Sequence, residues 1–141
     1  YCGKVYLAKC LDVARVALAC GLPVEYVGEQ KDVQPYLRSC MAYVLPSYHE
    51  GTPKTILEAM ACGRPSITTD APGCRETVTD GVNGYLVPVK DVDAIVVAME
   101  KILDDHDKTA QMAIKARQIA EERYDVRKVN QTIRQTMGII N

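Results

Sequence analysis

Residues 42–69 read AYVLPSYHEGTPKTILEAMACGRPSITT, and this stretch decides the fold. It begins with a continuous apolar run, Ala42–Leu45, which is typical of a strand buried in a parallel sheet. A segment with helical character follows over 53–62, and Ser66–Thr69 is a second strand-like run. A helix between two short buried strands predicts a parallel sheet that is covered by helices.

The same alternation continues on both sides of this stretch. The further elements expected before residue 91 are helices over 7–19 and 33–40 and strands over 24–27 and 84–87. From residue 91 onward three amphipathic helices are expected, and Asp91 and Asp125 are positioned to cap the first and the third. The chain is therefore predicted to be one α/β domain over 1–141, with alternating strands and helices over 1–90 and a helical part over 91–141.

The bulk composition excludes several classes of protein. The net charge is −1, so no overall field attracts nucleic acid or anionic lipid. No apolar run reaches the length of about 18 residues that a membrane span needs, and the start lacks a secretory signal. We therefore expect a cytoplasmic protein with no nucleic-acid partner and no direct membrane insertion. Because the chain begins at Tyr1 instead of a methionine, we expect it to be part of something longer.

The cysteines do not form a metal-binding pattern. They lie at 2, 10, 20, 40, 62 and 74, without a Cys-x-x-Cys pair, and the chain has two histidines. A zinc site needs clustered thiolate or imidazole ligands, so neither a metal nor another cofactor is expected, and the thiols are expected to be buried and reduced. Asp91 and Asp93 have the spacing of a manganese-binding Asp-x-Asp, but a cap and a first-turn acid of a helix explain them better.

Ligands of parallel α/β sheets bind at the carboxyl ends of the strands, which places the chemistry just after Leu45, Thr69 and Val87. After the first of these, Thr52 is a good helix N-cap and Pro53 suits the first helical position. A helix N-terminus at this edge offers free backbone N–H groups and the positive end of a dipole, which together suit a phosphate. Gly51 leaves room for a ligand to approach.

Two carboxylates bracket this helix N-terminus. Glu50 precedes the helix, and Glu58 lies roughly 7–8 Å along the axis from Pro53. Carboxylates accept hydrogen bonds from sugar hydroxyl groups, so the spacing fits an extended ligand made of a hexose, a diphosphate and a ribose. The alternative is structural: Lys54 and Glu58 can form an ordinary surface pair, and Glu50 can simply favour the helix dipole.

The run PSYHEGTPKTILEAMACGRPSITTDAPGCRETVTDGVNGYLVP, over 46–88, resembles family-four retaining glycosyltransferases of the GT-B fold. The resemblance extends from about 24 to 124, and Glu50 and Glu58 match the family's Glu-x7-Glu motif. It implies a Rossmann-like three-layer domain, the C-terminal, donor-binding half of the GT-B fold. It also implies that Glu50 orients the donor sugar and stabilises charge as the catalytic residue, without forming a bond, and that Glu58 binds the ribose. The other residues that it assigns to the donor are Ser47, His49, Gly51, Thr52, Pro53, Lys54 and Thr55.

The resemblance also bears on the loop after the next strand. It places Pro72, Gly73, Cys74 and Glu76 beside the acceptor or the donor sugar, while the alternative is a Pro-Gly turn that leads into a helix. The resemblance also implies an Arg/Lys pair that neutralises the diphosphate near the start of the donor half. This chain has Lys4 and Lys9 but no arginine before Arg15, so either the opening unit is missing or these lysines take its place.

The implied reaction is transfer of a hexosyl or N-acetylhexosaminyl group, with retention, from a nucleotide sugar to a saccharide or lipid-linked acceptor. A UDP-sugar donor and bacterial surface polysaccharide synthesis are expected. We expect the acceptor domain to lie outside this chain and the isolated chain to be inactive. Any position at the inner face of a membrane is then expected to depend on that domain or on a partner chain. The alternatives are a stand-alone nucleotide-sugar-binding module that acts with a separate acceptor-binding chain, or a structural remnant that binds nothing.

Overall fold

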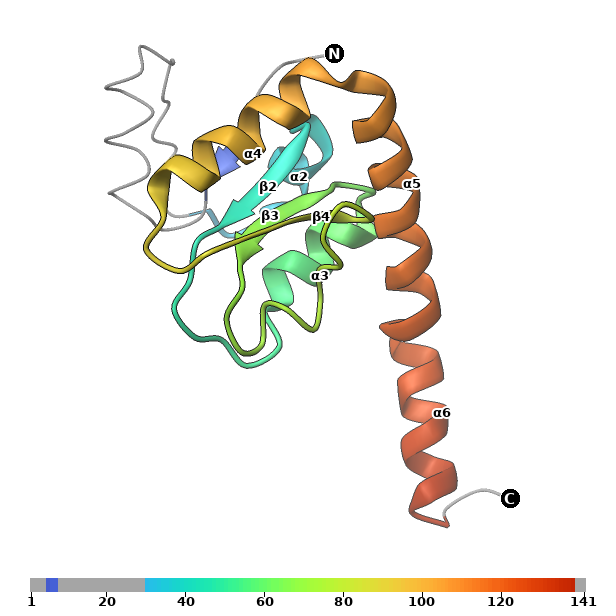
Figure 1. Ribbon diagram of the computed structural model, residues 1–141. Coiled ribbons are helices and arrows are strands. Elements are labelled where there is room, and N and C mark those ends of the chain that lie inside the picture. Colours follow the sequence, from blue (N-terminus) through green and yellow to red (C-terminus); the bar gives the residue numbers. More distant parts are fainter. Residues whose placement is uncertain (1–4, 8–29, 139–141) are drawn as a thin grey trace.

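The structure, a computed structural model, describes residues 5–7 and 30–138 (Figure 1). Four strands form one sheet in the order β1-β2-β3-β4, and each neighbouring pair is parallel. The strands are β1 (Val5–Leu7), β2 (Ala42–Leu45), β3 (Ser66–Thr69) and β4 (Gly84–Val87). The described helices are α2 (Gln34–Ser39), α3 (Lys54–Ala61), α4 (Val92–Asp104), α5 (His106–Arg123) and α6 (Val126–Thr136).

The sequence pattern predicted the three later strands with the bounds that the structure has, and the helix expected over 33–40 is α2. The prediction was wrong at Leu7, which ends strand β1 and pairs with Val44 instead of starting a helix. The rest of that helix and the strand expected over 24–27 lie outside the described residues, as do Lys4 and Lys9.

Each face of the sheet packs against helices, which gives the three layers that were expected. Along β2, Ala42 and Val44 point into one core, and Tyr43 and Leu45 point into the other. The first core contains the apolar side of α4, and the second contains residues of α2, α3 and α5. Because side chains of a strand alternate between its faces, an uninterrupted apolar run fills both cores at once. The molecule is an α/β domain with a parallel sheet, as predicted.

Aspartates begin the three C-terminal helices. Asp91 accepts a hydrogen bond of 2.9 Å from the Ala94 N–H, and Asp105 accepts one of 2.9 Å from the Lys108 N–H. Asp125 does the same for the Arg127 N–H. The predicted caps at Asp91 and Asp125 are confirmed, and these side chains satisfy donors that a helix N-terminus leaves free.

The last helix, α6, extends away from the sheet and the other helices (Figure 1). None of its residues is buried. The apolar face predicted for it is present but uncovered: Ile133 is 49% exposed and Met137 is 68% exposed. None of the helices in the described ranges is long and apolar enough to cross a membrane.

Deleting residues 126–141 should leave the domain folded. Since α6 buries no side chain in either core, we expect its loss to change the free energy of unfolding by less than about 1 kcal/mol. As a control, Met112→Ala in the first core should lower it by about 2–5 kcal/mol. Urea denaturation followed by circular dichroism measures both, and a deletion as costly as the core variant would contradict the packing described above.

Candidate functional site

The carboxyl ends of β2 and β3 are joined by side chain to backbone hydrogen bonds. The Thr68 hydroxyl donates to the Leu45 carbonyl over 2.7 Å. The Ser47 N–H donates to the Thr69 hydroxyl oxygen over 3.2 Å, and that hydroxyl donates to the Ser47 carbonyl. Parallel pairing already places both strand ends at one edge of the sheet, and these bonds fix the path of the chain as it leaves β2.

Ser47 also holds the Glu50 side chain. Its hydroxyl lies 2.9 Å from Glu50 Oε1, to which it donates, and 3.3 Å from the carbonyl oxygen of His49. Glu50 is half-buried, whereas the His49 side chain is exposed at the rim of the same loop. The Glu50 carboxylate is therefore oriented before any ligand is present and keeps acceptor capacity for one.

Helix α3 begins one residue later than the sequence predicted. Its N-cap is Pro53, with φ −70° and ψ 102°, and no side chain caps the helix, so the expected cap at Thr52 is wrong. Proline fixes φ near this value and the extended ψ keeps it outside the helix, while its carbonyl accepts from the N–H groups of Ile56 and Leu57. The N–H groups of Lys54 and Thr55 have no acceptor inside the helix, and they remain available to a ligand.

Glu58 lies on the exposed side of α3, in the second turn. The surface pair of Lys54 and Glu58 that was considered as an alternative is not formed: within the described residues these two exposed side chains make no salt bridge. Glu50 precedes the uncapped first turn of α3, and Glu58 follows in the second turn. The arrangement offers acceptors at both ends and N–H donors between them.

The loop after β3 packs directly against the loop after β2. The Glu50 N–H donates to the Pro72 carbonyl over 3.1 Å. Gly73 has φ +86°, and a Cβ added to it would lie 1.9 Å from the Gly51 carbonyl oxygen and 2.1 Å from that of Glu50. Only glycine fits this contact and this conformation. Gly51 itself has nothing within 4 Å of the position of a Cβ, which leaves space beside the α3 N-terminus.

The other residues predicted for this loop fall into two groups. Pro72 and Glu76 are exposed, and the Glu76 carbonyl accepts a hydrogen bond from the Tyr124 hydroxyl. Cys74 is fully buried, so its side chain belongs to the core and not to an open site. The turn of the alternative interpretation is present, with Gly73 in a left-handed conformation, but no helix follows it: residues 72–77 form consecutive turns.

The structure adds two residues at this edge that the sequence pattern did not indicate. Lys90, in the loop after β4, has φ 65° and places its ammonium group 5.9 Å from the centre of the Tyr48 ring. This cation–π contact connects the loops after β2 and β4. No sequence signal distinguishes Lys90 from an ordinary surface lysine, since the contact joins residues that are distant in the chain.

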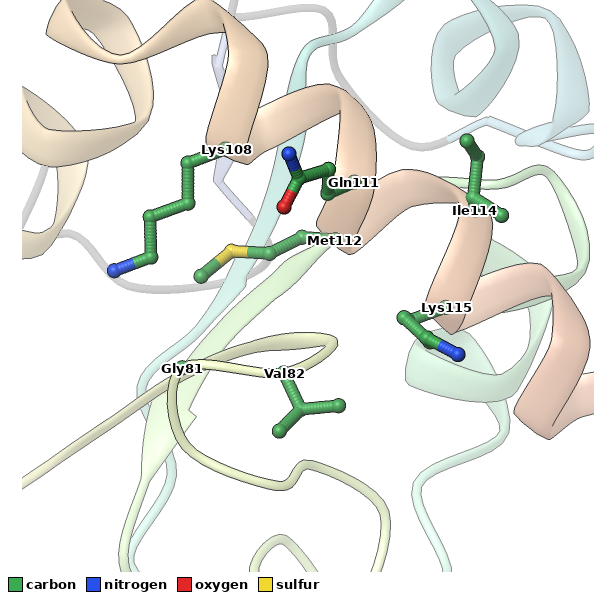
Figure 2. Close-up of a pocket in the computed structure, with 7 residues that line it drawn as sticks. All are labelled: Gly81, Val82, Lys108, Gln111, Met112, Ile114 and Lys115. Carbon is green, nitrogen blue, oxygen red and sulfur yellow. The ribbon is translucent and has the colours of Figure 1, made fainter.

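A hollow elsewhere on the surface is not part of this site. It lies between the turn before β4 and helix α5, and it is lined by Gly81, Val82, Lys108, Gln111, Met112, Ile114 and Lys115 (Figure 2). None of the predicted site residues lines it. Over the described ranges, no group of three histidine, cysteine, aspartate or glutamate side chains is arranged to hold a metal ion.

The parallel sheet with helices on both faces defines a Rossmann-like α/β domain. The family model of the glycosyl transferases group 1 matches residues 5–105. The chain belongs to this family, and its fold is that of the C-terminal domain of a GT-B glycosyltransferase, as the sequence resemblance implied.

Individual relatives agree with this assignment. An N,N'-diacetylbacillosaminyl-diphospho-undecaprenol alpha-1,3-N-acetylgalactosaminyltransferase of Campylobacter jejuni is 33% identical over 97 residues, which are 69% of this chain and 26% of the relative. The crystal structure of HepE from Anabaena in complex with UDP has a TM-score of 0.82 and 30% identity, and the match covers 92% of this chain and 36% of HepE. For the sucrose-phosphate synthase of Thermosynechococcus elongatus the TM-score is 0.75, with 27% identity over 91% of this chain and 34% of the synthase. The chain thus spans about a quarter to a third of these relatives.

Alanine substitutions at Gly73 and at Gly51 test the contact between the loops that follow β2 and β3. Gly73→Ala should lower the free energy of unfolding by more than about 2 kcal/mol, because its Cβ meets backbone atoms that cannot move aside and its φ is unfavourable for alanine. Gly51→Ala should change it by less than about 1 kcal/mol, because the new methyl group enters open space. Thermal denaturation of both variants measures the difference, and equal midpoints would show that the loops are not packed in this way.

Proposed function

We propose that this chain is the donor-binding half of a retaining glycosyltransferase that takes its sugar from a UDP-sugar. The observation that carries the proposal is the uncapped N-terminus of α3, which lies at the carboxyl edge of the sheet between Glu50 and Glu58. The free N–H groups and the helix dipole attract an anionic diphosphate. The carboxylates suit hydroxyl groups on either side of it.

Each residue then has a defined role in binding. The diphosphate lies against the N–H groups of Lys54 and Thr55, in the space that Gly51 leaves open. Glu58 accepts hydrogen bonds from the ribose hydroxyls. Glu50, oriented by Ser47, holds the sugar and stabilises the positive charge that develops on it as the bond to the phosphate breaks. It forms no bond to the sugar, and no metal takes part.

The relatives support a UDP-sugar donor and a lipid-linked or saccharide acceptor. HepE was crystallised with UDP, with UDP and glucose, and with UDP-glucose. A relative in Escherichia coli, 33% identical over 79 residues, is a UDP-Gal:alpha-D-GlcNAc-diphosphoundecaprenol alpha-1,3-galactosyltransferase. We therefore propose transfer of a hexosyl or N-acetylhexosaminyl group in bacterial surface polysaccharide synthesis.

The acceptor is proposed to bind outside this chain, on an acceptor domain or a partner chain. The matched relatives are three to four times as long as the part that corresponds to this chain. The hollow beside α5 lies away from the site described above, so it does not offer an acceptor pocket next to the donor sugar. This acceptor domain or partner chain would close over the sugar and exclude water. It would also supply any contact with the cytoplasmic face of a membrane.

A nucleotide titration tests the donor site. Calorimetry without metal should show tighter binding of UDP than of GDP, and Glu58→Ala should weaken UDP binding about 10- to 100-fold, the value of a hydrogen bond to a charged group. Glu100→Ala, on the exposed side of α4, is the matched control and should bind UDP as the parent chain does.

Three outcomes would contradict the proposal. Preference for GDP would overturn the donor assignment, and an unchanged affinity of Glu58→Ala would remove the ribose role of Glu58. Absence of UDP binding at millimolar concentration would contradict a donor site in this chain and favour a structural remnant.

A further inference from the structure

The side chain of Tyr43 lies directly beneath the first turns of α3. Tyr43 is in the middle of β2, is 5% exposed, and packs in the same core as Ile56, Ala59 and Met60 of that helix. The other residues of β2 are apolar, so Tyr43 brings the one side-chain polar group of this strand into the core.

The Tyr43 hydroxyl is buried, and within the described residues it forms no hydrogen bond of regular geometry, although the Thr55 side chain lies close enough to act on it as a hydrogen-bonding group. A buried hydroxyl without a partner destabilises the folded state, because it gives up hydrogen bonds to water without replacement. Phenylalanine would fill the same space without this penalty. Packing therefore does not account for the hydroxyl group, and its contact with Thr55 falls short of a regular hydrogen bond in this structure.

The groups around the hydroxyl belong to the donor site. Burial raises the pKa of Tyr43, a hydrogen-bonding contact with the Thr55 side chain lowers it, and the nearby carboxylates of Glu58 and Glu50 raise it further. The phenol therefore stays protonated at neutral pH and can donate a hydrogen bond. Among these neighbours Thr55 is suited to pass that bond on, because a hydroxyl accepts and donates at the same time.

We propose that Tyr43 is a positioning residue of the donor site, which acts through Thr55. With a nucleotide sugar bound, the Tyr43 O–H donates to the Thr55 hydroxyl oxygen, and the Thr55 hydroxyl proton is thereby directed outward to a phosphate oxygen. Tyr43 itself does not touch the ligand, since its hydroxyl is buried. This inference rests on the proposed function and extends it by one buried residue.

The position of Thr55 supports this arrangement. Thr55 is the second residue of α3, its side chain is exposed, and its backbone N–H has no acceptor in the helix. A phosphate at the helix N-terminus would thus meet an N–H and a hydroxyl from the same residue. A neutral chain of two hydroxyl groups adds a directed donor beside two carboxylates without placing another charge in the core.

The test compares Tyr43→Phe, Thr55→Val and the double variant of this chain in UDP affinity, measured by NMR titration. Each single change should weaken UDP binding about 3- to 10-fold, the usual value of one hydrogen bond, and the double variant should be no weaker than Thr55→Val alone. Thr55→Ser keeps the hydroxyl and should keep the affinity. Tyr85→Phe removes a phenol from the other face of the sheet and should change nothing.

Thermal stability separates positioning from packing. The denaturation midpoint of Tyr43→Phe should equal or exceed that of the parent chain, because the substitution removes a buried hydroxyl that lacks a regular hydrogen bond. A lower midpoint together with weaker binding would show a structural role and overturn the inference, as would additive losses in the double variant. If the parent chain binds UDP and Tyr43→Phe binds it equally well, only this inference fails; if the parent chain does not bind UDP, the proposed function fails with it.

Discussion

One hydrogen bond, from the Glu50 N–H to the Pro72 carbonyl, joins the two loops on which the candidate site depends. It forms only because Gly73, in a conformation that side chains disfavour, lets the second loop approach the Glu50 and Gly51 backbone closely. The loop after β2 then leads into α3 through Pro53, whose extended ψ keeps it outside the helix, and no side chain caps the first turn. The N–H groups of this first turn therefore have no acceptor inside the helix.

The strands could be predicted because their signal is local. β2, β3 and β4 are short runs whose residues are buried on both faces, and such runs are visible in sequence without knowledge of their partners. The start of α3 was misjudged by one residue because threonine and proline both suit positions near a helix start, and the terminal residue of a helix is the least certain part of such a prediction. The pair Glu50 and Glu58 was found because its spacing lies within one segment.

The remaining features depend on contacts between distant residues, which no local pattern encodes. The link from Lys90 to Tyr48 and the burial of Cys74 become evident only once the strands are side by side. Tyr43 did carry a signal, since it is the one residue with a polar side chain in an apolar strand, but its relation to Thr55 required the packing of α3 on β2. The exposed apolar face of α6 was predicted as a helical face, and its lack of cover within the described chain was not.

The most direct test of a donor site at the α3 N-terminus is backbone amide NMR of the isotope-labelled chain during titration with UDP-glucose. The account predicts the largest chemical-shift changes at Gly51, Lys54 and Thr55, with smaller changes at Gly73, whose loop packs against them. Changes concentrated around Gly81 and Lys108 instead, at the hollow beside α5, would contradict it.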